Sequence, residues 1–187
     1  VIHKGETAEL GKYVGSDVET DIRFNWSGTV LGLYHPEKMI FGTKLRAGDK
    51  LIALRDCFRS NGLSSVRAAL ANRFGKAWYS IPEARPYIQA ASRPSRLYDY
   101  FLASINGWYD RNFKAQIPIH FIAHITGGGF PEKFAQPLFT LGLSADLPDL
   151  WGPPAVMKEC AEWRGITGPE FYTTFNGGQG VIVGLAK

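Results

Sequence analysis

The stretch Ile117–Leu138, IPIHFIAHITGGGFPEKFAQPL, contains the transition on which the predicted fold depends. Residues Ile117–Ile125 alternate and are rich in β-branched and aromatic side chains, which is typical of a strand. The strand runs into Thr126 and three glycines, and Pro131 then suits the first turn of a helix that extends to Leu138. Such a turn can present several backbone N–H groups to an anion such as phosphate. A tight turn that only lets the helix pack is an equal alternative.

Further elements are predicted on both sides of this stretch. Strands are predicted at Phe24–Tyr34, Lys50–Leu54 and Gln179–Leu185, and helices at Ser64–Phe74, Arg96–Tyr109 and Pro153–Arg164. Residues Lys76–Ser95 contain three prolines and are predicted to form a loop. Because helices and strands interleave without a regular βαβ rhythm, we expect an α+β fold, a mixed β-sheet with helices packed on it.

The composition is that of an ordinary globular protein. The 187 residues are 45% hydrophobic and 20% charged, and the net charge of +4 is spread along the chain. Because Lys and Arg form no blocks and no run of about 18 apolar residues occurs, we expect neither a nucleic-acid nor a membrane partner. Cys57 and Cys160 lack CxxC partners, which favours free thiols in a reducing cytoplasm, and the four histidines lack zinc-site spacing. The sequence therefore predicts a soluble, cytoplasmic protein.

A second order of strand, turn and helix lies upstream. Ser60, Asn61 and Gly62 follow the predicted strand Lys50–Leu54 and precede the next predicted helix. They are candidates for a second anion cradle, with Arg59 as a charged partner. An Asn-Gly turn followed by a helix cap is the simpler alternative.

Other candidate residues are isolated in the sequence. Glu6 and Glu9 lie three residues apart, as on one helical face or beside a metal-bound phosphate, although a solvated terminus is the simpler interpretation. His124 precedes the glycine turn and is interpreted as a residue that holds the loop more readily than as a catalytic base. Asn176 lies in a predicted turn, where its side chain can bond backbone or ligand. No GxSxG or HExxH pattern occurs, so the catalytic residues stay unknown.

Five motifs follow one another along the chain. They are GETAE at 5–9, LRAGD at 45–49, SNGLS at 60–64, AHITGGGF at 123–130 and YTTFN at 172–176, the last followed by Gly178 and Gly180. This ordered set resembles the aminoimidazole ribonucleotide synthetase family, the phosphoribosylformylglycinamidine cyclo-ligases of purine biosynthesis. The similarity covers nearly the whole chain and is weakest between residues 76 and 91.

The resemblance implies two α/β domains per chain, a homodimer, and ATP-dependent cyclisation of formylglycinamidine ribonucleotide to aminoimidazole ribonucleotide, with Mg²⁺ required. Residues 1–48 would be the tail end of the N-terminal ATP-side domain and a linker strand. Residues 49–187 would be the C-terminal domain, incomplete at its C-terminus. ATP and Mg²⁺ would bind mainly through the N-terminal ATP domain, which this chain lacks, so we expect the chain to be inactive alone.

Motif matching also implies residue roles. Glu6, Thr7 and Glu9 would lie on the nucleotide and metal side, while no metal ligand is assigned with certainty. His124 and Asn176 would support the site. The residues implied to bind the substrate's phosphate are Arg59, Ser60, Asn61, Gly62, Thr126, Gly127, Gly128 and Gly129.

One departure from the family leaves the substrate open. Residues Arg55–Arg59, RDCFR, stand where the family has a Ser-rich, Gly-containing run that ends in His. Related enzymes are therefore alternatives: formylglycinamidine synthase, selenophosphate synthetase, thiamine-phosphate kinase and the hydrogenase-maturation dehydratase. The HITGGG and TTFN motifs favour the cyclo-ligase among them. A further alternative is a noncatalytic module that lost its ATP half.

Overall fold

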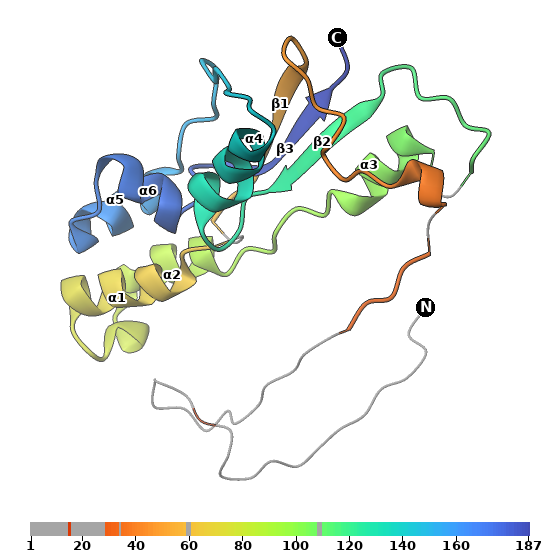
Figure 1. The fold of residues 1–187 in the computed structure, drawn as a ribbon. Coiled ribbons are helices and arrows are strands. Elements are labelled where there is room, and N and C mark those ends of the chain that lie inside the picture. The colour runs from red at the N-terminus through yellow and green to blue at the C-terminus, as the bar shows by residue number, and fades with distance from the viewer. Residues whose placement is uncertain (1–14, 16–28, 34, 59–60, 108–109) are drawn as a thin grey trace. The chain divides into compact units, whose positions relative to one another are not determined.

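The computed structural model describes residues 15, 29–33, 35–58, 61–107 and 110–187 (Figure 1). The chain divides into two compact units, Val1–Gly32 and Leu33–Lys187, and every helix and strand described below lies in the second. The strand predicted at Phe24–Tyr34 is wrong over residues 29–33, which form no strand and leave Val30 and Leu31 more than nine-tenths exposed. Its other residues lie outside the described part. The division into domains 1–48 and 49–187 stays a prediction.

Three strands form the sheet: β1 (Lys50–Arg55), β2 (Ile119–His124) and β3 (Gln179–Leu185). Their order is β1-β3-β2, and both outer strands pair antiparallel with β3. The apolar run of β3 suits this central place, since Gln179–Gly184 is buried along its whole length. The strands predicted at Lys50–Leu54, Ile117–Ile125 and Gln179–Leu185 are confirmed, and so is the α+β class.

Helices cover both faces of the sheet (Figure 1). On one face, the π-helical turn Pro131–Ala135 and α4 (Gln136–Thr140) direct Phe134 and Leu138 against Ile182. On the other face, Leu102 and Ile105 of α3 (Asp99–Asn106) pack near Val181 and Val183. Since residues 181, 182 and 183 alternate along β3, the two apolar clusters share one strand.

A helical cluster at one end of the sheet forms the third apolar core. It is built around α1 (Leu63–Phe74) and α5 (Ala155–Arg164), which pack against each other. Val66 and Leu70 are four residues apart and therefore lie on one side of α1, where they are buried with Met157 and Cys160 of α5. The predicted helices Ser64–Phe74 and Pro153–Arg164 are confirmed, and Gly75 ends α1 as expected.

One further prediction about local structure is wrong, and one helix was not predicted. The predicted loop Lys76–Ser95 contains short 3₁₀ turns and α2 (Arg85–Ala91), because Pro86 lies in the first helical turn, where its missing N–H costs nothing. The sequence reasoning also missed α6 (Gly168–Thr174), whose first turn likewise contains a proline. No helix among the described residues combines the length and apolar character needed to cross a membrane.

Candidate functional site

Three segments that carry sequence motifs meet at one end of the sheet. Because β1 and β2 both run antiparallel to β3, both end where β3 begins. The backbone N–H of Asp56, after β1, donates to the carbonyl oxygen of Gly178 at 2.9 Å, and that of Ile125, after β2, donates to Gly180 at 2.9 Å. The motifs that this topology gathers are Asn61-Gly62, Thr126–Gly129 and Asn176–Gly178.

Ring contacts hold two of these segments on α6 and the turn that follows it. Phe58, in the segment after β1, lies edge-on to Phe175 with ring centroids 5.8 Å apart. Phe130, next to the glycine triplet, makes the same kind of contact with Tyr172 at 5.5 Å. Such pairs stabilise beyond the area they bury, so the two turns have a shared, rigid support.

Close packing explains two of the motif glycines. Gly62 has φ of 85°, and a Cβ atom added there would lie 2.8 Å from the Thr174 carbonyl oxygen. Gly129 has φ of 57°, and its added Cβ would lie 2.8 Å from the Thr173 carbonyl oxygen. Both positions therefore require glycine for backbone conformation and for contact with the end of α6.

Gly127 differs from these two glycines. It is exposed, its φ is not positive, and a Cβ atom added there would meet nothing within 4 Å. Packing therefore gives no reason for glycine at this position. Close approach of a ligand to the backbone is the other physical use of a glycine, and the open space beside Gly127 permits it.

The two motif asparagines have different surroundings. Asn176 is fully buried, and its Oδ1 accepts the backbone N–H of Gly178 at 2.8 Å, so it holds the segment before β3 in place. The Oδ1 and Nδ2 atoms of Asn61 are also buried, yet neither has a hydrogen-bond partner in the described structure. A buried amide without partners is costly and calls for an explanation such as a ligand.

The remaining predicted residues are placed as follows. Thr126 accepts the backbone N–H of Gly129 at 2.8 Å through its carbonyl oxygen, which closes the glycine turn. His124 is exposed at the end of β2. Predicted site residues that lie outside the described part are Glu6, Thr7, Glu9, Arg59 and Ser60.

Sequence reasoning missed two buried polar residues at this end of the sheet. Asp56 is 2% exposed, and Gln179 is fully buried with its Nε2 donating to the carbonyl oxygens of Trp151 at 3.1 Å and Gly177 at 2.6 Å. Tyr98 lies close by and donates its O–H to the Arg55 carbonyl oxygen at 3.0 Å. Burial, and then the negative charge of Asp56, raise the pKa of Tyr98. None of these residues belongs to a motif that would reveal it.

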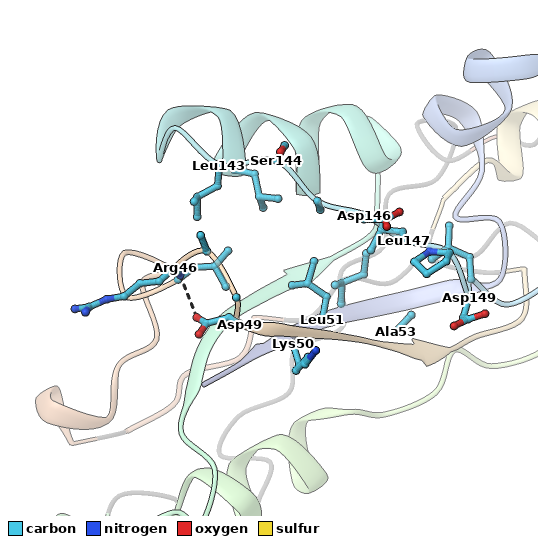
Figure 2. Close-up of a pocket in the computed structure, with 18 residues that line it drawn as sticks. Arg46, Asp49, Lys50, Leu51, Ala53, Leu143, Ser144, Asp146, Leu147 and Asp149 are labelled. Atoms are coloured by element: carbon cyan, nitrogen blue, oxygen red, sulfur yellow. Dashed lines mark hydrogen bonds between the residues drawn. The ribbon is translucent and has the colours of Figure 1, made fainter. Parts of the chain in front are cut away.

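A separate cavity of about 550 Å³ lies beside β1 (Figure 2). Its walls are the turn at Arg46–Asp49 and the loop 143–150, and Leu51 and Ala53 of β1 form part of its floor. Basic and acidic side chains are mixed around it, including Lys50, Asp146 and Asp149. None of the predicted site residues lines this cavity, so it is distinct from the three-segment site.

The described residues provide no metal site. Among them, no group of three or more His, Cys, Asp or Glu side chains is arranged to hold a metal ion. The three-segment site presents backbone N–H groups, an amide and a hydroxyl in place of clustered carboxylates. These groups suit an anionic or hydrogen-bonding ligand better than a divalent cation.

The fold and this site together define an α+β domain whose candidate ligand-binding groups lie on three loops at one end of an antiparallel sheet. No protein-family model matches the chain. The chain is, however, 31% identical over 179 residues to the phosphoribosylformylglycinamidine cyclo-ligase of Synechococcus sp. (strain CC9311). The alignment covers 94% of this chain and 48% of that enzyme, so the chain spans about half the length of the curated relative it matches.

The chain is therefore similar to the C-terminal part of a phosphoribosylformylglycinamidine cyclo-ligase. The resemblance inferred from the five ordered motifs is thereby confirmed. The alignment covers 94% of this chain, which confirms that the similarity extends over nearly its whole length.

Proposed function

We propose that this chain is the substrate-binding part of an ATP-dependent cyclo-ligase that converts formylglycinamidine ribonucleotide to aminoimidazole ribonucleotide in purine biosynthesis. The name of the relative and the order of the motifs support the reaction class. The observation that carries the proposal is the convergence of Asn61-Gly62, Thr126–Gly129 and Asn176–Gly178, with the buried Asn61 amide lacking a partner in the described structure.

In this proposal the three segments bind the ribonucleotide's phosphate and ribose. The backbone beside Gly127 is open to a phosphate, and the Asn61 amide supplies a donor and an acceptor. Arg59 and Ser60 complete the site by motif match, Gly62, Gly128 and Gly129 shape the turns, and His124 and Asn176 support them. Enclosure between the loops would also shield an activated amide from water.

The proposal assigns ATP and Mg²⁺ to an N-terminal ATP domain of the same protein, with Glu6, Thr7 and Glu9 near the junction. That domain is the expected partner, and a cytoplasmic homodimer is the expected assembly. The present chain would therefore be inactive by itself. Its own contribution would be to bind and orient the ribonucleotide.

Activity measurements with a matched partner test this function. We would follow ATP-dependent cyclisation of formylglycinamidine ribonucleotide by this chain, with and without the separately expressed N-terminal half of its parent protein. Activity only in the presence of the added half is the expected result. No activity with a folded, ATP-binding half would overturn the proposal in favour of a related enzyme or a noncatalytic module.

Binding measurements test the site independently of turnover. Titration calorimetry with the same ribonucleotide is expected to show weaker binding by the double variant Asn61→Ala, Thr126→Val than by the wild type. Asp146→Asn, at the separate cavity, is the control and should bind as the wild type does. Unchanged affinity in the double variant would remove the phosphate cradle from the proposal.

A further inference from the structure

Only one of the two side-chain oxygens of the buried residue Asp56 accepts a hydrogen bond from its surroundings. Its Oδ1 accepts the backbone N–H of Cys57 at 2.7 Å and that of Arg96 at 3.4 Å. Its Oδ2 is buried and has no hydrogen-bond partner among the described residues. The side chain is 2% exposed, so water does not take the place of a partner at its surface. An acceptor of this kind is expected to meet a donor in the functional state.

The nearest donor is Tyr98, and hydrogen bonding to the Asp56 side chain is one of the causes that raise the pKa of Tyr98, after burial and the negative charge of Asp56. The O–H of Tyr98 is directed to the Arg55 carbonyl oxygen, at 3.0 Å. Among the described residues, Asp56 forms no ion pair with a Lys, Arg or His side chain. Because buried charges in proteins are normally paired, a cationic donor is the partner that would compensate this carboxylate best.

Asp56 is part of the three-segment site by its backbone. Its N–H donates to the carbonyl oxygen of Gly178, whose own N–H donates to Asn176. Its Cβ also lies against Gly180, where a Cβ atom added to the glycine would be 2.8 Å away. The same Gly180 accepts the N–H of Ile125, which precedes the glycine turn.

The two ends of the site are therefore separated by the width of β3. Asp56 follows β1 and the Thr126–Gly129 turn follows β2, with β3 between them. Two strand spacings correspond to about 10 Å. A carboxylate repels phosphate, so the phosphate is expected at the glycine turn and a group of opposite charge at Asp56.

We propose that Asp56 recognises the protonated amidine of the substrate. The inference rests on the proposed function, because the relative's name describes a compound with a phosphoribosyl group and a glycinamidine group. The phosphate and the amidine have opposite charges and lie on either side of the ribose. An amidinium N–H to the Asp56 Oδ2 is a charge-assisted hydrogen bond, and rotation of a side chain on ligand binding is a common way to form such a contact.

Two ligands that differ in one group test this assignment. Titration calorimetry on the full chain would compare formylglycinamidine ribonucleotide with its amide analogue, in which a carbonyl oxygen replaces the amidine nitrogen. Wild-type protein should bind the amidine form about 10- to 100-fold more tightly. Asp56→Asn should lose that preference and keep the wild-type affinity for ribose 5-phosphate, a probe of the phosphate end alone.

Controls separate recognition from folding. Asp49→Asn removes a carboxylate at the other end of the sheet and should keep the preference for the amidine. If Asp56→Asn does not fold, Asp56→Glu, which keeps the charge, is measured in its place and should retain a preference.

Three results would overturn the inference. Equal wild-type affinity for both ribonucleotides would show that the amidine is not recognised. An equal loss of affinity for both in Asp56→Asn would show a purely structural role. These two results leave the proposed function in place, whereas failure of the wild type to bind either ribonucleotide would overturn the proposed function together with the inference.

Discussion

The Nδ1 atom of His120, on β2, lies 2.7 Å from Oδ2 of Asp49, in the turn before β1. The same oxygen accepts the backbone N–H of Arg46 at 3.0 Å (Figure 2). Since β1 begins and β3 ends here, this pair joins the two outer strands at the end of the sheet opposite the candidate site.

Because of the Asp49–His120 pair, we expect the free energy of unfolding to fall in acid. The hydrogen bond from His120 is the main cause that holds the pKa of Asp49 below its ordinary value of 3.8. A carboxyl whose pKa is lower in the folded chain adds stability above its unfolded pKa and loses it as pH falls through the folded pKa. Urea denaturation should therefore show the wild type losing stability below about pH 4 more steeply than Asp49→Asn.

Asp146→Asn is the control for this prediction. Asp146 is exposed in the loop beside β1, and its removal should leave the pH dependence of the wild type unchanged. Parallel stability curves for the wild type and Asp49→Asn would contradict a role of the pair.

Gly129 and Gly127 should respond differently to alanine. Gly129→Ala is expected to lower the free energy of unfolding by about 2 kcal/mol or more, because φ is 57° and the Thr173 carbonyl oxygen lies 2.8 Å from the added Cβ. Gly127→Ala should change it by less than about 0.5 kcal/mol, since nothing lies within 4 Å. Urea denaturation measures both, and equal losses would show that packing does not distinguish the two glycines.

Gly127→Ala should weaken ligand binding without lowering the stability of the fold. A methyl group beside the open backbone would hinder an approaching phosphate, so we expect weaker binding of ribose 5-phosphate by calorimetry, with an unchanged melting temperature. Asp146→Asn, at the separate cavity, is the control and should bind ribose 5-phosphate as the wild type does. Wild-type affinity in Gly127→Ala would argue against phosphate at this turn.

Alanine substitution should affect Asn176 and Asn61 differently, lowering stability at the first and ligand affinity at the second. Asn176→Ala leaves the buried N–H of Gly178 without its acceptor, and we expect a loss of about 1–3 kcal/mol in the free energy of unfolding. Asn61→Ala removes an amide that has no partner in the described structure, so stability should fall much less while ribonucleotide affinity falls. A larger stability loss in Asn61→Ala than in Asn176→Ala would contradict this division.

The thiol of Cys160 should be inert in the folded protein. Burial raises its pKa to about 11, and the side chain is fully buried on α5. Because the thiolate is the reactive form, iodoacetamide near pH 8 should modify Cys160 only after unfolding, as mass spectrometry of the digested protein would show. Cys57 is half-buried and serves as the internal comparison. Rapid modification of Cys160 in the native protein would indicate that its surroundings open.

Much of the secondary structure could be predicted from local pattern. The bounds of β3 follow from an apolar run between glycines, and α1 follows from the spacing of Val66 and Leu70 and from Gly75. Prolines misled the prediction around Pro86, because proline breaks a helix interior but suits its first turn. At Val30 and Leu31 a strand was predicted where the structure has none. Apolar residues in an extended pattern form a strand only when a neighbouring strand pairs with them.

The site was predictable only where a motif marked it. Asn61 and Gly127 belong to short turns between predicted elements, and their backbone roles could be proposed from residue type. Asp56 and Gln179 could not, because their importance depends on which oxygen and nitrogen atoms remain paired after the strands assemble. That the segments after β1 and β2 meet at all depends on β3 lying between them, which is a property of the sheet order.

The central place of β3 also sets an order for synthesis and folding. Both of its partner strands precede it along the chain. Ile52 pairs with Val183, although these two residues are separated in the sequence by most of the described chain. On the ribosome, β1 and β2 have no strand to pair with until β3 has emerged, so the sheet forms late and through distant contacts. A nonsense mutation before Gln179 would leave two unpaired apolar strands, a state prone to aggregation and to removal by cellular proteases.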